Sequence, residues 1–364
     1  MRRSLRVALV AGLCAVLLVA THAQQETLPS ARLISAPRLV MPGAVDSNVP
    51  MTWELVDGNW RLFAFTSWGG IPALLSGAAL DQMRPVGPVT IVGPGDGIWI
   101  ESIVTDDTGA WYAYYHHERP ADACGRPDRS IPRVGSAKST DRGLTWEDLG
   151  IVLEAPPDRT ACASSNRFVL GGVGDLSVML APDRTDLFLF FSQYSKVPSE
   201  QGVAVARLAW ADRDAPGGRV TIWRNDAWLP AGRVAGADAD DPVGWEYPAG
   251  TPLVPVSRPW HDGNAAADAF WGPSVHWNQY LERYVMLLNR ARDEHFNNEG
   301  IYVSYARSLD APLAWSVPRK IMNDGGWYPQ VAGLEPVTGT DKQAGQRARF
   351  LVTGRSDHYI EFQR

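Results

Sequence analysis

A pattern of residue types recurs roughly every 50 to 70 residues along this chain, and it limits the folds that the chain can adopt. Each unit begins with a short segment that carries a polar or acidic residue, continues through an aromatic apolar segment and a segment of small residues, and ends at a turn that leads to a tryptophan. Short apolar runs bounded by Gly and Pro are typical of β-strands. A repeat of this length predicts the blades of a β-propeller.

Five such units can be traced, so we predict an all-β fold, a five-bladed β-propeller. The fifth unit is one strand short at the C-terminus. Residues 37–40, which precede the first unit, could supply the missing strand. Pairing of the N-terminal and C-terminal strands in one blade would remove the exposed sheet edges. The units begin near Asp46, Trp99, Gly174, Phe270 and Trp327.

The N-terminus reads as a secretion signal. Three arginines precede an apolar run over residues 7–20, and small residues up to Ala23 follow, as a signal peptidase requires. The run is shorter than the about 20 residues of a membrane span. We therefore expect residues 1–23 to be a signal peptide, residues 24–364 to form a single propeller domain, and the mature protein to be secreted or periplasmic.

The net charge of the mature chain limits the classes of partner that we expect it to bind. The signal segment holds three of the 34 basic residues and no acid, which leaves 31 basic residues against 40 acidic ones, a net charge of −9. A chain with this balance and without a basic tract is not expected to bind nucleic acid or an anionic membrane. We expect a monomer that binds a carbohydrate, for the reasons given below.

Two cysteines remain after the signal segment, Cys124 and Cys162, both in loops rich in Gly, Pro and Asp. Export favours a disulfide between them, and two unpaired thiols are the alternative. Neither belongs to a closely spaced Cys pair, so a zinc site is not expected.

Acidic residues lie at the start of three consecutive units: Asp46, Glu101 and Asp175. The innermost strands of a propeller line its central channel, so these carboxylates could converge on one mouth. Each lies where a polar loop meets an apolar strand, a costly place for an unpaired charge. Glycoside cleavage requires one carboxyl group to protonate the leaving oxygen and another to activate water or attack carbon. The alternative is that each acid hydrogen-bonds the backbone of a neighbouring blade.

Other candidates lie near the same mouth. His116 and His117 end the aromatic segment of the second unit, and strand alternation lets only one of them point inward. A two-His metal pair is therefore not expected, and we predict no cofactor, although a single structural cation in the channel is conceivable. Trp271 and Tyr328 open the fourth and fifth units and could stack on a sugar. The full set of substrate-binding candidates is Asn48, His116, His117, Trp271, Arg290, Glu299 and Tyr328.

Residues 139–146, Ser-Thr-Asp-Arg-Gly-Leu-Thr-Trp, fit the Asp-box pattern S-x-D-x-G-x-T-W. The Asp accepts backbone hydrogen bonds in a tight turn, the Gly adopts a φ that other residues resist, and the Trp packs under the hairpin. The pattern predicts a blade hairpin and not a catalytic site.

The order of elements resembles the five-bladed propeller glycosidases of the arabinanase, xylosidase and levanase type. Residues 46–50, Asp-Ser-Asn-Val-Pro, with Trp53 resemble their first-blade segment, and residues 308–310 with Trp315 and Pro318 resemble their outer-strand motif. The resemblance implies a glycosidase with Asp46 as general base or nucleophile.

The other two acids depart from the pattern of that family, which places an Asp on the second blade and a Glu acid on the third. Here Glu101 comes second and Asp175 third. Roles taken by position make Asp175 the acid and Glu101 the group that tunes its pKa, whereas roles taken by residue type reverse them. We favour residue type.

These features predict a secreted glycoside hydrolase that acts on a poly- or oligosaccharide through paired carboxylates in the channel. One alternative is a non-catalytic carbohydrate-binding propeller, which the exchanged order of the acids favours. Another is a sialidase-like enzyme, of which the Asp-box is reminiscent. That enzyme would need six blades, a Tyr nucleophile and three convergent Arg, for which Arg133, Arg290 and Arg355 are the candidates.

Overall fold

The computed structural model describes residues 28–234, 244–261 and 266–364. The predicted signal peptide, residues 1–23, lies outside the described residues. No helix in the described part of the chain is long and apolar enough to cross a membrane.

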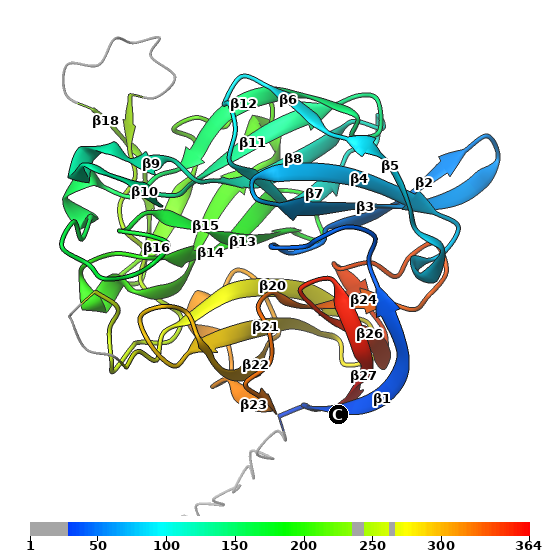
Figure 1. Ribbon diagram of the computed structural model, residues 1–364. Coiled ribbons are helices and arrows are strands. Elements are labelled where there is room, and N and C mark those ends of the chain that lie inside the picture. Colours follow the sequence, from blue (N-terminus) through cyan, green and yellow to red (C-terminus); the bar gives the residue numbers. More distant parts are fainter. Residues whose placement is uncertain (1–27, 235–243, 262–265) are drawn as a thin grey trace, which may run out of the picture.

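Five sheets are arranged around a central axis, so the fold is a five-bladed β-propeller, as predicted (Figure 1). We number the blades in chain order and list the strands of each blade in the order in which they are hydrogen-bonded to one another. Blade 1 is β2 (Met51–Val56), β3 (Asn59–Trp68), β4 (Ile71–Gly77) and β5 (Arg84–Pro88). Blade 2 is β7 (Ile98–Thr105), β8 (Trp111–His117), β11 (Arg133–Ser139), β12 (Thr145–Leu153) and β6 (Thr90–Val92). Blade 3 is β13 (Val173–Leu180), β14 (Asp186–Gln193), β15 (Gly202–Ala209), β16 (Thr221–Arg224) and β17 (Ala227–Pro230).

The last two blades complete the ring. Blade 4 is β25 (Gln343–Ala344), β20 (Phe270–Asn278), β21 (Arg283–Ala291), β22 (Asn298–Ala306) and β23 (Arg319–Asn323). Blade 5 is β24 (Pro329–Gly333), β26 (Arg347–Val352), β27 (Arg355–Gln363) and β1 (Ser30–Val40). Two short hairpins lie outside the blades, β9 (Pro120–Ala121) with β10 (Arg126–Ser130), and β18 (Gly232–Arg233) with β19 (Trp245–Glu246).

The predicted closure of the ring is confirmed. The N-terminal strand β1 runs antiparallel to β27, from the pair Ser30–Gln363 to the pair Val40–Arg355, and the two strands lie side by side in Figure 1 in dark blue and red. The closing strand is longer than residues 37–40, because it begins at Ser30. It covers the edge of β27, which would otherwise present unpaired backbone groups.

The hydrophobic core lies between the blades. The strands β8 and β14 are buried on both faces apart from the first residue of β14, because a neighbouring blade covers each face of their sheets. Alternation along β3 sends Phe63 and Phe65 into the core shared with blade 2, and Leu62 and Ala64 into the core shared with blade 5. This packing fixes the innermost strands, and therefore the residues at the mouth of the channel.

The turn between β11 and β12 is built around Asp141. Its carboxylate accepts hydrogen bonds from the backbone N–H groups of Leu144 (3.1 Å) and Thr145 (3.0 Å), and Gly143 has a φ of +84°. The indole N–H of Trp146 donates to the carbonyl of Gly143 (3.0 Å). These bonds close the turn locally, and none of its residues lines the pocket described below.

Cys124 and Cys162 form a disulfide in the structure. It joins the loop of the β9–β10 hairpin to the segment that precedes β13. The same two segments are also paired through the backbone, where Ser130 and Phe168 bond at 2.9 Å. Together these links hold Phe168 in place on one side of the channel mouth.

Candidate active site

Three innermost strands break their regular pairing at the same end of the channel. The register of β7 shifts at Glu101, that of β13 at Asp175, and that of β20 between Trp271 and Ser274. A bulge leaves a residue outside the ladder and re-aims its side chain. Asp175 also has a φ of +39°, a conformation that costs energy in a non-glycine residue and persists only where the surroundings hold it.

Hydrogen-bond donors from two other chain segments hold the carboxylate of Asp175. The hydroxyl of Tyr194 donates to Oδ2, and the hydroxyl of Tyr328 donates to Oδ1 at 3.2 Å. His116 Nδ1 lies 3.3 Å from Oδ1 of Asp175 and 3.1 Å from its backbone nitrogen, whose N–H it can accept from only while Nδ1 is unprotonated. The carboxylate is thus fixed in one orientation between blades 2, 3 and 5.

His116 lies between carboxylates, which decides its charge. Burial alone would lower its pKa, but hydrogen bonds with Asp175 and Glu101, and the charges of Asp175 and Glu118, raise the pKa well above its usual value. A proton on Nδ1 would face Asp175 and also Glu101 Oε1, which is 3.6 Å away. The ring is therefore expected to carry a positive charge among the surrounding acids.

Glu101 is covered by other residues and does not reach the pocket. Its side chain is only 1% exposed, and Oε2 accepts a hydrogen bond from the backbone N–H of Leu176 in blade 3 (2.7 Å). Burial raises its pKa to about 7, although a hydrogen bond with His116 acts in the opposite direction. This geometry contradicts the assignment of the proton donor by residue type, since a donor must contact the leaving oxygen. It matches the alternative of an acid bonded to the backbone of a neighbouring blade.

Asn48 also lies below the pocket. Its amide nitrogen donates to the carbonyl of Leu176 (3.0 Å) in blade 3 and to that of Pro273 (3.1 Å) in blade 4. The side chain is buried and ties three blades together across the axis. Asn48 therefore supports the floor of the site and does not face a substrate.

Above this floor lies a pocket of about 80 Å³ to which all five blades contribute. Three of the lining side chains are carboxylates, Asp46, Glu118 and Asp175, one is His116, and the other seven are aromatic or apolar. No Lys or Arg is among the described residues that line it. The lining residues are Asp46, His116, Glu118, Phe168, Val169, Asp175, Tyr194, Trp271, Phe296, Trp327 and Tyr328.

Burial and neighbouring charges raise the pKa of two carboxyl groups in the pocket, Asp46 and Glu118. Burial, and then the negative charges of Asp175 and Glu118, raise the pKa of Asp46 to about 6. Burial also raises the pKa of Glu118, while the charge of His116 lowers it and that of Asp175 raises it. Glu118 Oε1 lies 3.7 Å from His116 Nε2. Raised pKa values of this kind favour the use of a carboxyl group in acid–base catalysis.

The structure brings five of the ten predicted catalytic and substrate-binding residues into the pocket: Asp46, His116, Asp175, Trp271 and Tyr328. Glu101 and Asn48 lie beneath it, as described above.

Three predicted residues lie elsewhere. His117 points to the other face of β8, where Arg133 Nε lies 3.3 Å from its Nδ1 and where burial lowers its pKa to about 4. Arg290 and Glu299 both bond the hydroxyl of Tyr302 in blade 4, at 3.4 and 2.7 Å. Neither lines the pocket.

Several lining residues were not among the predicted site residues. Glu118 follows the inward-facing His116 by two positions, so strand alternation alone could have identified it. Tyr194, Phe168 and Phe296 lie in connections between strands, where no local pattern marks them. Trp327 precedes Tyr328 and was noted only as the opening of the fifth unit.

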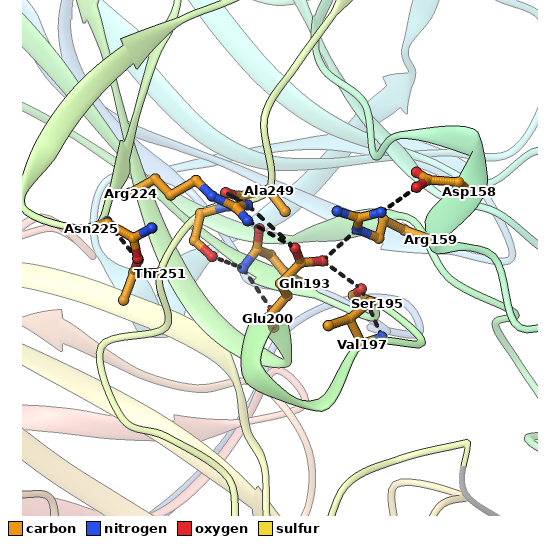
Figure 2. A network of polar contacts seen from close by, with 11 residues as sticks. Asp158, Arg159, Gln193, Ser195, Val197, Glu200, Arg224, Asn225, Ala249 and Thr251 are labelled. Atoms are coloured by element: carbon orange, nitrogen blue, oxygen red, sulfur yellow. Dashed lines mark hydrogen bonds and ion pairs between the residues drawn. The ribbon is translucent and has the colours of Figure 1, made fainter.

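The connection that carries Tyr194 is anchored by a buried glutamate, Glu200. Its carboxylate accepts hydrogen bonds from Arg159 (2.8 Å), Arg224 (3.3 Å) and Ser195 (2.9 Å), and Figure 2 shows the two arginines reaching it from opposite sides. Gln193 extends the same network to the backbone of residues 200 and 250. This network positions the start of the connection, and hence the hydroxyl that bonds Asp175.

The group Glu101, His116 and Asp175 is the one place in the described chain where three ligand atoms lie close enough for a metal ion, within 4.8 Å of one another. Their polar atoms are already engaged: Glu101 Oε2 accepts from Leu176, and both oxygens of Asp175 accept from tyrosines. A coordination sphere would need those lone pairs. The three residues fit a hydrogen-bonded cluster better than a metal cage, and we derive no step through a metal.

The sequence matches no protein-family model and no curated protein. Three solved structures illustrate what its structure is similar to. An endo-arabinase from Bacteroides thetaiotaomicron has 9% identity and a TM-score of 0.48, over 89% of this chain and 96% of that one. A thermostable family-43 glycoside hydrolase has 11% identity and a TM-score of 0.49, over 91% and 92%. A GH43_1 enzyme from Xanthomonas citri, complexed with xylose, has 15% identity and a TM-score of 0.46, over 91% and 90%. Similarity at this level transfers no activity, so the function has to be argued from the site itself.

Proposed function

We propose that the protein is a glycoside hydrolase that acts on a poly- or oligosaccharide. The observation that carries this proposal is the pocket in which carboxylates from blades 1, 2 and 3 face aromatic side chains from blades 4 and 5. Sugars present hydroxyl groups to acids and apolar C–H faces to aromatic rings, and a small concave site with this lining suits them. We also propose that the protein is exported, on the strength of the predicted signal segment.

The pocket supports a division of roles among its carboxylates. Asp46 acts as general base or nucleophile, because it faces the pocket and becomes ionised above a pKa of about 6. Glu118 donates the proton to the leaving oxygen, because burial raises its pKa and its side chain is 37% exposed. Asp175, held by two tyrosines, contributes the fixed charge that raises the pKa of both. Glu101 acts only through His116.

A sialidase-like activity fits the pocket poorly. It would require arginines for the carboxylate of the sugar, and no arginine is among the described residues that line the site. Of the candidates, Arg133 lies beside His117 and Glu154, and Arg290 bonds Asp268 and Tyr302. The acids in the pocket would in addition repel an anionic sugar.

The test is the release of reducing sugar from a panel of arabinans, xylans, galactans, fructans, agars and sialosides. We expect release by the wild-type protein and a loss of at least about a hundredfold in the variants Asp46→Asn and Glu118→Gln. Glu154→Gln is the matched control, since Glu154 lies on the same blade with a similar side-chain exposure of 32% and does not line the pocket. Binding of a glycan without release would instead favour the non-catalytic carbohydrate-binding propeller.

A further inference from the structure

The hairpin between β3 and β4 carries an exposed apolar pair, Trp68 and Ile71. The two residues are cross-strand partners, and their exposed fractions are 59% and 67%. Isolated apolar residues are common on protein surfaces, but a tryptophan and an isoleucine side by side form a continuous apolar face.

Backbone hydrogen bonds hold this pair near the pocket, although neither residue is among the described residues that line it. The N–H of Asp46 donates to the carbonyl of Ser67 (2.8 Å), directly before Trp68 in the chain. On the other side of the hairpin, the carbonyl of Gly70 accepts from the N–H of Ile98 (3.0 Å), at the start of β7. The hairpin is therefore fixed between the proposed base and the second blade.

The hairpin is also rigid, and its side chains have a defined direction. Gly70 has a φ of +75°, and a Cβ there would lie 2.4 Å from Gly97, so its backbone rests directly on the neighbouring blade. Ser67 faces blade 2, where its Oγ accepts from Ile100 N–H (3.2 Å). Because side chains alternate along a strand, Trp68 faces the opposite side, toward the segment that leads to Asp46.

The pocket itself limits what can lie beside this face. Its volume of about 80 Å³ leaves room for at most one sugar unit, so the rest of an oligosaccharide must lie outside it. Its carboxylates, with no Lys or Arg among the described lining residues, disfavour uronic acids and sialic acids. An apolar face next to such a pocket suits the C–H surface of a neutral sugar.

We propose that Trp68, together with Ile71, binds a second sugar unit of a neutral glycan whose terminal unit occupies the pocket. This inference rests on the proposed function of the pocket. Loss of the indole removes the apolar area that the second sugar would cover, so we expect about a tenfold rise in KM for oligosaccharides. The chemistry at the first unit, and hence kcat, is expected to stay the same.

The test compares Trp68→Ala with Trp60→Ala. Trp60 lies on the same strand at its opposite end and is 49% exposed, so it controls for the loss of a surface tryptophan. The substrates are nitrophenyl glycosides of neutral pentoses and hexoses, and neutral arabino-, xylo- and galacto-oligosaccharides of two to five units. We expect Trp68→Ala to raise KM for the oligosaccharides alone, Trp68→Phe to restore most of the affinity, and Trp60→Ala to change neither.

Three outcomes would overturn the inference: an unchanged KM in Trp68→Ala, an equal loss for the monosaccharide glycosides, or the same loss in Trp60→Ala. A change in the sedimentation of the unliganded protein on Trp68→Ala would assign the pair to a contact between copies and also overturn it. If the wild-type protein hydrolyses none of the substrates, the proposed function fails separately. Calorimetric binding of the same oligosaccharides to wild type and Trp68→Ala then decides the inference alone, with loss of binding supporting it and unchanged or absent binding refuting it.

Discussion

Replacing the proposed catalytic base should stabilise the protein at neutral pH. Burial and the charges of Asp175 and Glu118 raise the pKa of Asp46 from 3.8 to about 6. A group whose pKa is higher in the folded state contributes stability below its unfolded pKa and loses that contribution as pH rises through its folded pKa. Asp46→Asn keeps the shape of the side chain but never ionises, so it should escape this loss.

The size of the effect follows from the shift. At 1.36 kcal/mol per pH unit, ionisation of Asp46 costs the fold about 3 kcal/mol at pH 8 and only about 0.5 kcal/mol at pH 4. The free energy of unfolding of Asp46→Asn, relative to wild type, should therefore rise by about 2.5 kcal/mol between these values. Effects of the amide that do not depend on pH cancel in this comparison. Partial exposure of Asp46 weakens the repulsion, so a rise of at least about 1.5 kcal/mol would support the reasoning.

The assay is urea unfolding of both proteins at pH 4, 6 and 8, with hydrolysis measured on the same preparations. We expect a stability difference that grows with pH, together with a loss of activity of at least about a hundredfold. A difference that stays constant, or that shrinks as pH rises, would refute the claim that the fold holds Asp46 in an unfavourable environment. Full activity in the variant would refute its catalytic role.

Further predictions concern the pH profile, the disulfide and the network around Glu200. If Asp46 is the base, log(kcat/KM) of the wild-type enzyme should fall with a slope of one as pH drops below about 6, and a flat profile down to pH 4.5 would argue against it. Replacing Cys124 and Cys162 by Ser should lower the free energy of unfolding by about 4 kcal/mol, because a disulfide between residues 38 positions apart constrains the unfolded chain. A loss of less than about 1 kcal/mol in urea unfolding would contradict this expectation. Glu200→Ala should lower the free energy of unfolding in urea by about 3 kcal/mol, because it leaves two arginines without their buried partner. Asp158→Ala removes only an exposed partner of Arg159, so it should lower that free energy by less than about 0.5 kcal/mol. Equal losses in the two variants would show that burial does not set the energy of this network.

Half of the catalytic and binding residues predicted from the sequence, five of ten, line the pocket. The prediction was most accurate for residues at or near the start of an innermost strand, as Asp46, Asp175, Trp271 and Tyr328 are, because the start of such a strand lies at the channel mouth. Arg290 and Glu299 lie near strand ends of blade 4, but on its second and third strands, and they bond Tyr302 away from the axis. A polar residue at the end of a strand can lie either on the outer surface or at the mouth of the channel. Only the position of that strand within its blade distinguishes the two cases.

The fold class, the number of blades and the closure of the ring could all be predicted from the amino-acid sequence, because they depend on periodicity and on the need to pair the last sheet edge. Which acid lines the pocket depends instead on contacts between the blades. Glu101 and Asp175 occupy equivalent positions in their units, and both lie at bulges. Yet Glu101 meets the backbone of Leu176 and is covered by His116, whereas Asp175 reaches the pocket under two tyrosines from distant segments. That difference arises from contacts between blades, which depend on side-chain geometry around the axis and leave no trace in the local pattern of either strand.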